Sequence, residues 1–253
     1  MTAAETRIRS HHAGWIRKIN KLKYDFVTDL DLEVEQIIRG VLTEADGAGV
    51  EFLGEEYGGR SDLGSGRYWV IDPIDGTTNL VRDIPTFSVT LALVVEGAPV
   101  IGIVSAPMLG ERYMAVLGQG ARTVRGTSRG PLCVSSVDAL EGSLVSMNDI
   151  VSLSPDGRSC AGAMTGAVAA RALQVRCHGS IALDMAWVAA GRLEACIAFS
   201  SRPWDVLAGT LLVREAGGCT YDTRGREHAL DSTTAVASTP RIKDELLRVL
   251  MPT

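Results

Sequence analysis

The sequence predicts an α+β fold for residues 1–130 and an α/β fold for residues 131–253. Two observations predict this division. The first part carries consecutive β-rich runs separated by short, glycine-containing turns, which is typical of an antiparallel meander. In the second part, strand-like and helix-like segments alternate, which is the pattern of an α/β unit. We therefore expect one large domain or two closely associated subdomains, joined between residues 126 and 131.

The first part is predicted to begin with a helix and to continue into the meander. Apolar residues at helical spacing predict a helix over residues 29–42, with Thr28 as its N-cap and Asp31 in a capping-box position. An apolar strand over residues 68–71 follows, and Pro73 is expected to bend the chain after it. The β-rich runs of the meander are residues 88–95, 100–104 and 112–116.

The second part is predicted to alternate strands and helices. The expected strands are residues 144–147, 174–178 and 193–199. The expected helices lie within residues 162–173, over 180–190 and over 203–216. Gly217 and Gly218 are expected to stop the last helix. The Ser- and Gly-rich segment 150–163 is predicted to be a surface loop.

Composition and charge disfavour several classes of protein. The chain has a formal net charge of -5 and a pI near 5.4, whereas a nucleic-acid partner would call for a basic face. The five cysteines are spread without a C-x-x-C pair, which favours reduced thiols over a disulfide framework. No apolar run has the length of a signal-peptide core or a membrane span. We therefore expect a cytoplasmic protein without a nucleic-acid or membrane partner.

The turn after the 68–71 strand carries the strongest functional signal. It contains Asp72, Asp75, Gly76, Thr77 and Thr78, and either threonine is placed to begin a helix whose free amides favour an anion. Two carboxylates this close repel each other unless a cation lies between them, and Mg²⁺ or Ca²⁺ prefers such oxygen ligands. The alternative is an Asx-rich turn without a ligand. Because a turn rarely needs both acids and both threonines, we favour a metal and phosphate site.

Three further acidic sites lie in positions suited to a ligand. Glu55 and Glu56 follow an apolar strand, and at least one is expected to project beside the turn. Asp205 begins a strongly apolar helix, where an acid ordinarily serves the helix dipole or the cap. Asp31 has an equally ordinary alternative as the capping-box partner of Thr28. A functional role for these acids therefore depends on their being considered together with the turn.

Taken together, these segments resemble the inositol monophosphatase family over nearly the whole chain. Four motifs occur in family order: 25-DFVTDLD-31, 54-GEE-56, 69-WVIDPIDGTTN-79, and 204-WDV-206 with 215-EAGG-218. The resemblance implies a sandwich of alternating α, β, α, β and α layers, as in inositol monophosphatase and fructose-1,6-bisphosphatase. It also implies a Mg²⁺-dependent, Li⁺-sensitive phosphomonoesterase acting on a small sugar or polyol phosphate, and a homodimer as the family default.

The resemblance further implies a set of metal ligands. Glu55, Asp72 and the backbone carbonyl of Ile74 would hold one Mg²⁺, and Asp72, Asp75 and Asp205 would hold a second. A third, looser ion would share Glu55, and Mn²⁺ is expected to substitute for Mg²⁺.

The same resemblance implies the catalytic roles. Glu55 and the Thr77 hydroxyl would orient a metal-bound water, and Asp31 would fix Thr77 by a hydrogen bond. Amides of Gly76, Thr77 and Thr78 would hold the phosphate oxygens. The expected reaction is direct attack by water, without a covalent phosphoenzyme.

The chain departs from the family pattern at the substrate pocket. Where inositol-specific members place an acidic residue, this chain has Ala198, which argues against myo-inositol phosphate itself. Arg202 in the same segment is a candidate for contacting a second anionic or polar group, with a solvated loop residue as the alternative. Arg176 and Asp184 are further candidates for lining the pocket.

Three rival functions remain. The run 54-GEEYGG-59 is similar to the histidinol-phosphate phosphatase branch, although Thr78 stands where that branch is expected to have lysine. A phosphatase with an aspartyl nucleophile needs two aspartates separated by one residue, whereas Asp72 and Asp75 are separated by two. An inactive homologue that only binds metal or a phosphorylated ligand is the non-enzyme alternative, and the complete acid set argues against it.

Overall fold

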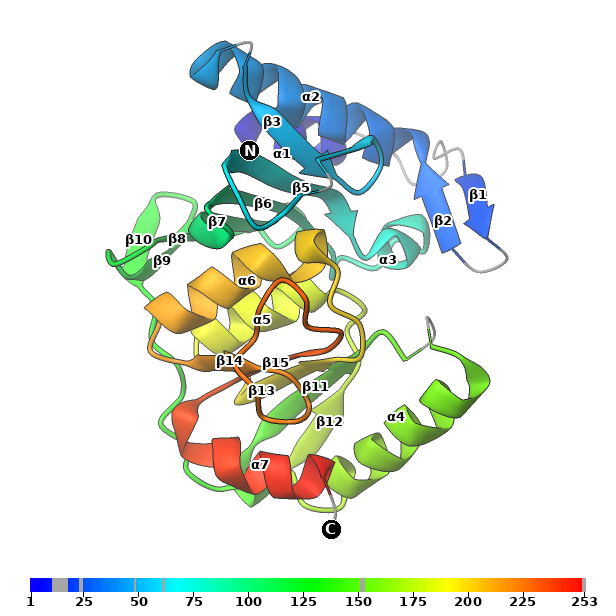
Figure 1. Ribbon diagram of the computed structural model, residues 1–253, viewed down its shortest axis with the longest axis vertical. Coiled ribbons are helices and arrows are strands. Elements are labelled where there is room, and N and C mark those ends of the chain that lie inside the picture. The colour runs from blue at the N-terminus through cyan, green and yellow to red at the C-terminus, as the bar shows by residue number, and fades with distance from the viewer. Residues whose placement is uncertain (11–17, 23–24, 48, 61, 151–152, 252–253) are drawn as a thin grey trace.

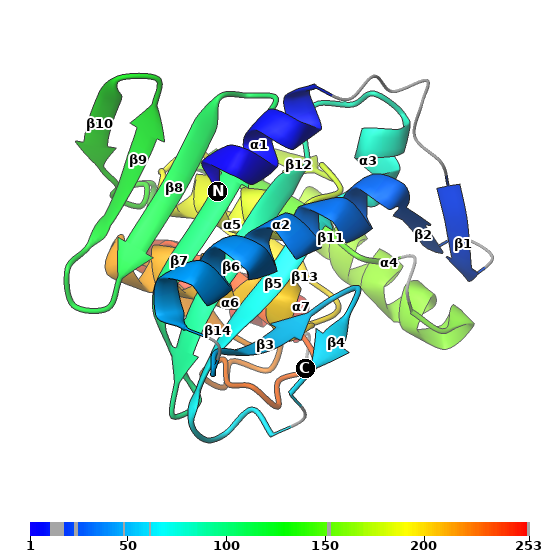
Figure 2. The ribbon, with the colours of Figure 1, turned by 90° about the horizontal axis from the view of Figure 1, so that it is seen from above.

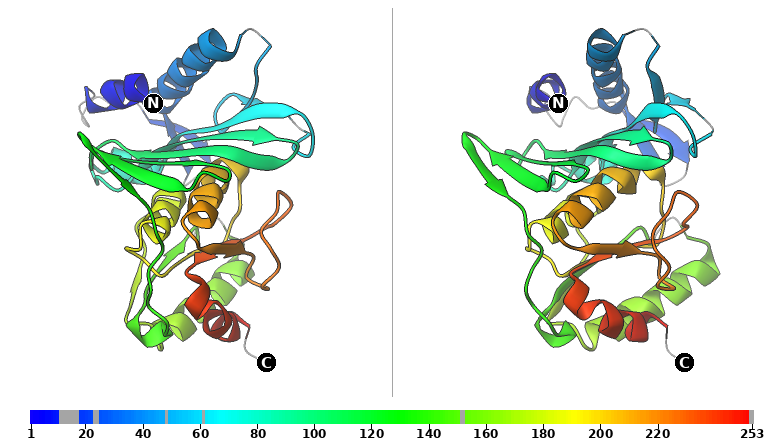
Figure 3. Two further views of the ribbon diagram at one scale, coloured as in Figure 1. Left: turned by 90° about the vertical axis from the view of Figure 1, so that its left-hand side faces the viewer. Right: turned by 60° about the vertical axis from the view of Figure 1, so that its left-hand side comes forward.

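Five layers of secondary structure stack in the computed structural model, which describes the chain except residues 11–17, 23–24, 48, 61, 151–152 and 252–253. Figures 1 and 3 show two helical outer layers, two sheets and a helical layer between the sheets. The outer helices are α1 (Thr2–Arg9) and α2 (Asp29–Asp46) on one side and α4 (Pro155–Ala169) and α7 (Lys243–Leu250) on the other. The central helices are α5 (Ile181–Ala189) and α6 (Pro203–Glu215). The expected α-β-α-β-α sandwich is confirmed.

The first sheet has eight strands in the order β10-β9-β8-β7-β6-β5-β3-β4. Figure 2 shows α1 and α2 lying across it. Its strands are β3 (Glu51–Gly54), β4 (Gly58–Gly59), β5 (Arg67–Asp75), β6 (Ser88–Val95), β7 (Ala98–Ala106), β8 (Glu111–Val116), β9 (Ala121–Arg125) and β10 (Ser128–Pro131). Strands β5 to β10 pair antiparallel in sequence order, as the meander predicted, whereas β3 and β5 pair parallel.

The second sheet has five strands in the order β12-β11-β13-β15-β14. These are β11 (Leu144–Asn148), β12 (Gln174–Arg176), β13 (Ala195–Ala198), β14 (Cys219–Tyr221) and β15 (Ala235–Ser238). Strand β11 is parallel to β12 and β13, and β15 is antiparallel to β13 and β14. The remaining elements are the β1 (Lys18–Leu22) and β2 (Asp25–Thr28) hairpin, α3 (Thr77–Val81), and 3₁₀ turns at Leu140–Gly142 and Pro240–Ile242. The sequence-based division at residue 130 stays a prediction.

The central helices are buried between the two sheets. All residues of α6 from Val206 to Val213 are buried, because a helix between two sheets has apolar neighbours on every side. Met185 of α5 and Leu211 of α6 are each 1% exposed, and burying a side chain of this size contributes about 1.5–3 kcal/mol. This packing fixes the start of α6, where Asp205 lies. No helix in the described part of the chain is long and apolar enough to cross a bilayer.

Two sequence-based predictions of local structure were wrong. The predicted loop over residues 150–163 is largely helix α4, which begins at Pro155. Ser154 caps it by accepting a hydrogen bond from the Gly157 amide, so the Ser- and Gly-rich composition marked a helix start. Residues 151–152 of that segment lie outside the described residues. The strand expected to end at residue 71 continues through Pro73 to Asp75, with an irregular register between Asp72 and Asp75.

Candidate metal centre

The irregular end of β5 carries two of the predicted ligands. The pairing of β5 with β6 is regular up to Asp72 and resumes at Asp75, and Pro73, which has no amide hydrogen, lies in the interruption. The Ile74 amide donates to Asp72 Oδ1 at 2.8 Å and fixes that side chain within the irregularity. Gly76 then turns the chain into α3 with φ of 102°, a conformation that favours glycine.

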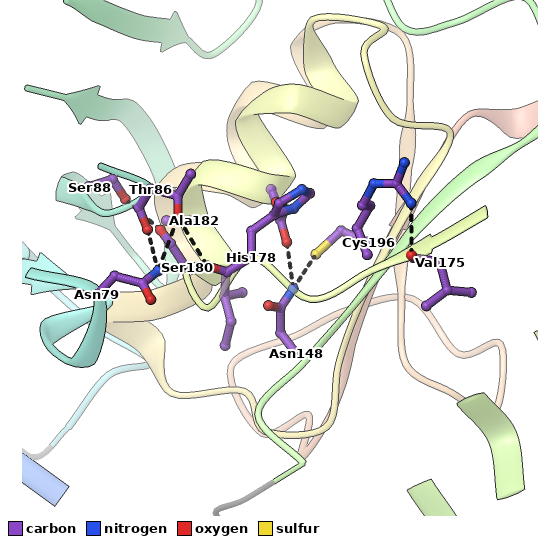
Figure 4. A network of polar contacts seen from close by, with 12 residues as sticks. Asn79, Thr86, Ser88, Asn148, Val175, His178, Ser180, Ala182 and Cys196 are labelled. Atoms are coloured by element: carbon purple, nitrogen blue, oxygen red, sulfur yellow. Dashed lines mark hydrogen bonds and ion pairs between the residues drawn. The ribbon is translucent and has the colours of Figure 1, made fainter. Parts of the chain in front are cut away.

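Gly76 also permits a close approach between distant segments. A Cβ atom at Gly76 would lie 2.9 Å from the carbonyl oxygen of Gly179. Gly179 itself has φ of 80°, and a Cβ there would lie 3.0 Å from Asn79 Nδ2. Asn79 Nδ2 donates to the carbonyl oxygens of Thr86 and His178, both at 2.6 Å, as Figure 4 shows. The turn after β5 is thereby attached to the segment that leads into α5.

Three carboxylates from two elements meet at this point. Asp72, Asp75 and Asp205 each offer an oxygen that lies within 4.8 Å of the other two. Asp72 is 1% exposed and Asp75 is 7% exposed, and Asp205 reaches them from the first turn of α6. Oxygen ligands in a buried acidic cluster are the donor set that Mg²⁺ and Ca²⁺ prefer.

The electrostatics of the cluster also fit a cation. Burial, and then the charges of Glu55, Asp75 and Asp205, raise the pKa of Asp72 well above its usual value. Burial and the charges of Asp75 and Glu55 raise the pKa of Asp205, with Arg202 acting in the opposite direction. Since desolvation and like charges disfavour the ionised forms, a divalent cation among these oxygens would relieve both effects.

Asp75 differs from Asp72 because protein donors surround it. Ser180 Oγ donates to Asp75 Oδ2 at 2.6 Å, and the amides of Ile181 and Ala182 donate to the same carboxylate at 3.3 and 2.8 Å. Ser88 Oγ lies 3.4 Å from Oδ2. Burial raises the pKa of Asp75 to about 6, although these bonds act to lower it. The start of α5 therefore holds Asp75 in place.

Asp31 lies between a helix cap and the candidate site. The Thr28 amide donates to Asp31 Oδ2 at 2.9 Å, which confirms the predicted capping box. Thr77 Oγ1 lies 3.1 Å from Asp31 Oδ1 and 3.1 Å from the Ile74 carbonyl oxygen. Burial raises the pKa of Asp31 to about 6 against the bonds from Thr28. The expected contact between Asp31 and Thr77 is present, and the catalytic role of both residues stays a prediction.

Glu55 and the phosphate-binding turn lie beside the cluster. The Glu55 amide donates to the Ile71 carbonyl oxygen at 3.1 Å, which holds the end of β3 against β5. Glu55 is outside the group of three carboxylates within 4.8 Å, but its charge reaches both Asp72 and Asp205. Gly76, Thr77 and Thr78 precede the first intrahelical bonds of α3, where helix amides face outward.

The predicted substrate residues occupy different environments. Ala198 is 1% exposed at the end of β13, and Arg202 is the exposed N-cap residue of α6. Arg176 is exposed on β12 and donates to Gln174 and to the Val175 carbonyl oxygen. Asp184 is fully buried in α5.

Both oxygens of the Asp184 carboxylate have polar partners within the protein. His178 Nδ1 lies 2.7 Å from Oδ1, and Asn148 Nδ2 donates to Oδ2 at 2.8 Å. Figure 4 shows Asn148 and His178 in this network. Asp184 thus holds the segment before α5 to the end of β11 and has no exposed surface to offer a substrate.

Sequence reasoning missed Ser88 and Ser180, which touch Asp75. Ser88 follows Asp75 by 13 residues and Ser180 follows it by 105. Only the position of Ser180 beside Gly179 at a helix start could have drawn attention to it.

The inositol monophosphatase family matches residues 3–251. The chain belongs to this family. Inositol-1-monophosphatase ImpA of Mycolicibacterium smegmatis is 34% identical over 243 residues, covering 93% of this chain and 83% of that protein. Nus factor SuhB of Pasteurella multocida is 35% identical over 232 residues, covering 90% and 83%.

A solved structure supports the same assignment. The crystal structure of the extragenic suppressor protein SuhB from Bartonella henselae has a TM-score of 0.90 at 30% identity and covers 100% of this chain and 95% of that one. The family resemblance inferred from the four motifs is therefore confirmed. Membership in the inositol monophosphatase family is consistent with a phosphatase.

Proposed function

We propose that this protein is a Mg²⁺-dependent phosphomonoesterase that hydrolyses a small sugar or polyol phosphate by direct attack of water. The observation that carries the proposal is that oxygens of Asp72, Asp75 and Asp205 lie within 4.8 Å of one another, with Asp72 and Asp75 buried and Asp205 partly exposed. Family membership supports the same chemistry.

The residues around this cluster suit two to three metal ions. Asp72, Asp75 and Asp205 would hold one, and Glu55, Asp72 and the Ile74 carbonyl oxygen would hold another. When bound, Mg²⁺, or Mn²⁺ in its place, lowers the pKa of water and neutralises phosphate charge.

The chain's own groups orient the reactants. The Thr77 hydroxyl donates to Asp31 Oδ1, which leaves a lone pair on Oγ1 to accept a hydrogen bond from the attacking water and so to orient it. The Glu55 carboxylate is a second acceptor for that water. The amides of Gly76, Thr77 and Thr78 would hold phosphate oxygens at the start of α3.

Substrate choice depends on the segment between β13 and α6. Ala198 offers no hydrogen-bond acceptor for a sugar hydroxyl, while the exposed guanidinium of Arg202 lies close enough to Asp205 to affect its pKa. We therefore propose that the preferred ester carries a second anionic or polar group, which Arg202 contacts. Arg176 and Asp184 are weaker candidates because the first is exposed on β12 and the second is fully buried.

Two alternative functions compete with this proposal. Histidinol phosphate is one alternative substrate, because residues 54–59 are similar to the histidinol-phosphate phosphatase branch. Several relatives are named Nus factor SuhB, so a partner-binding role without catalysis is the other. The complete acid set favours catalysis. Lithium sensitivity, a homodimer and a cytoplasmic location are further expectations from the family.

A phosphate-release screen tests the proposal. Inositol, histidinol, fructose bisphosphate and nucleotide 3′-phosphate esters are incubated with Mg²⁺ or with EDTA, and inorganic phosphate is measured with malachite green. We expect Mg²⁺-dependent release from at least one ester, and loss of release in Glu55→Gln. Release that is no faster with Mg²⁺ than with EDTA across the panel would favour the non-catalytic alternative.

A further inference from the structure

A fully buried acid outside the ligand set, Glu35, lies one helical turn after Asp31 in α2. Residues i and i+4 lie on the same face of a helix, so both acids face the site side of α2. The Glu35 side chain has no exposed surface. A buried carboxylate is costly unless it is paired and hydrogen-bonded, so the contacts that satisfy it indicate what it does.

Both oxygens of Glu35 are engaged by groups around the turn that follows β3. Oε2 accepts a hydrogen bond from the Glu56 amide at 2.9 Å. Oε1 accepts from Arg39 Nε at 2.8 Å, and Arg39 Nη2 donates to the Gly58 carbonyl oxygen at 2.8 Å. The pair formed by Glu35 and Arg39 therefore binds the turn at two points, one on each side of Tyr57.

The same turn is held from the opposite side by β5. The Glu55 amide donates to the Ile71 carbonyl oxygen, so two consecutive amides, those of Glu55 and Glu56, have partners on two different elements. Gly54 makes the approach of α2 possible, because a Cβ atom at this position would overlap the Glu35 carboxylate. These contacts leave the peptide between Glu55 and Glu56 little freedom to rotate.

We propose that Glu35 is a positioning residue of the metal centre, which sets the direction of the Glu55 side chain by holding the amide of Glu56. This inference rests on the proposed function, in which Glu55 is a metal ligand. Glu35 acts through the backbone and touches neither metal nor substrate. One face of α2 then positions two parts of the site, since Asp31 holds Thr77 and Glu35 holds the Glu55 turn.

Substitutions at Glu35 separate this role from simple stabilisation. Glu35→Leu removes the acceptor, Glu35→Asp withdraws it by one methylene while keeping the charge near Arg39, and Glu35→Gln keeps an oxygen for the Glu56 amide. Mn²⁺ binding to the full-length protein is measured without substrate by the electron paramagnetic resonance of free Mn²⁺. The Mg²⁺ concentration for half-maximal phosphate release and the thermal midpoint in EDTA are measured alongside.

We expect Glu35→Leu to weaken Mn²⁺ binding about tenfold to a hundredfold and to raise the half-saturating Mg²⁺ by a similar factor. Glu35→Asp should show a smaller shift in the same direction, and it carries the test if Glu35→Leu does not fold. Glu35→Gln should restore most of the Mn²⁺ affinity, because the hydrogen bond to Glu56 is kept. Glu55→Gln provides the benchmark for loss of the ligand itself.

Glu33 supplies the matched control. It lies on the same helix, its side chain is 46% exposed, and it pairs with Arg7 at 2.6 Å. Glu33→Leu should leave Mn²⁺ binding unchanged, and an equal loss in this variant would overturn the assignment.

Two outcomes separate this inference from the proposed function. If wild-type protein and Glu55→Gln behave as proposed but folded Glu35 variants lose only thermal stability and keep wild-type Mn²⁺ affinity, Glu35 is structural and the positioning role fails. If the wild-type protein itself binds no Mn²⁺ and releases no phosphate, the proposed function fails, and the positioning role fails with it.

Discussion

Asp72 at the end of β5 and Glu111 at the start of β8 are both buried carboxylates, 1% and 3% exposed, in opposite electrostatic settings. Glu111 accepts from Arg192 Nη1 at 2.8 Å and also bonds Arg125 and the Tyr113 hydroxyl. Burial acts to raise the pKa of Glu111, but the bonds from Arg192 and Tyr113 outweigh it, and the pKa is lowered. At Asp72, burial and neighbouring acids act together, and the pKa is raised.

The difference shows how a structural acid differs from a ligand-type acid in this chain. The charge of Glu111 is balanced by arginines of the protein itself. At Asp72 and Asp205, the neighbouring charges with the largest effects on the pKa are those of other acids, and Arg202 opposes them at Asp205. A cluster left in this state is a candidate for binding an external cation, whereas a balanced acid is a candidate for stability alone.

The largest expected effect is on catalysis, from Asp205→Asn. Removing one ligand of the cluster should lower kcat about a thousandfold, because a bound metal contributes about 4 kcal/mol to the stabilisation of transition-state charge. The thermal midpoint in EDTA should stay the same or rise, since one repelling charge is gone. Steady-state kinetics at saturating Mg²⁺ and calorimetry check the two parts. Wild-type turnover in this variant would contradict the comparison.

Glu111→Gln should lower stability and leave activity unchanged, which is the opposite of the result expected for Asp205→Asn. The loss of charge-assisted bonds from partly exposed arginines should lower the free energy of unfolding by about 1–3 kcal/mol. Phosphate release per folded molecule should be unchanged, because Glu111 takes no part in the proposed site. Urea denaturation measures the change. Glu227→Gln, at a pair whose acid is 83% exposed, is the control and should change stability very little.

In the absence of metal, Asp75 and Glu111 should make the free energy of unfolding change with pH in opposite directions. The pKa of Asp75 is raised from its ordinary value of 3.8 to about 6, so the folded state binds more protons than the unfolded state between these values. The contribution of Asp75 to the free energy of unfolding is therefore fully present below pH 3.8 and is lost as the pH rises through 6. For Glu111, whose pKa is lowered, the contribution is present above its ordinary value of 4.5 and is lost as the pH falls.

Thermal unfolding in EDTA from pH 4 to pH 7 tests this contrast. Relative to Asp75→Asn, the wild-type protein should lose on the order of 2 kcal/mol over this range, and Mg²⁺ should restore it near pH 7. An identical pH dependence in the two proteins would show that burial does not raise the pKa of Asp75 in the folded protein.

The smallest expected effect is that of Arg202→Ala, which removes the guanidinium whose charge acts to lower the pKa of Asp205. KM should rise about fivefold, or about 1 kcal/mol, for an ester with a second anionic group, and should hardly change for an ester without one. Parallel kinetics on a bisphosphate and a monophosphate check the difference. An equal change in KM for both esters would mean that Arg202 does not contact a second group of the substrate.

The parts of the site that lie close together in sequence were predictable, and the parts that depend on packing were not. Asp72 to Thr78 form one continuous strand end and turn, so their chemistry is visible from spacing alone. The capping box of α2 was equally local. The roles of Ser180 and Glu35 arise from contacts that α5 and α2 make with other elements, which no local pattern encodes.

The remaining differences between prediction and structure have separate causes. Asp184 has the residue type of a pocket acid, but its position in α5 directs both of its oxygens to His178 and Asn148. The α4 helix was missed at its start because Ser154 and Pro155 are typical both of loops and of helix N-termini. Strands β14 and β15 were not predicted, because strands of three and four residues are too short to show an alternating pattern. Helix α7 was not predicted either.

The contact between Gly76 and Gly179 has a consequence for how the family can change through evolution. A Cβ atom at Gly76 would press on the Gly179 carbonyl oxygen, a Cβ atom at Gly179 would press on the Asn79 side chain, and both residues have a positive φ. A substitution at Gly76 is therefore opposed by a segment more than a hundred residues away in sequence. In an alignment of family members, we expect glycine at each of the two positions.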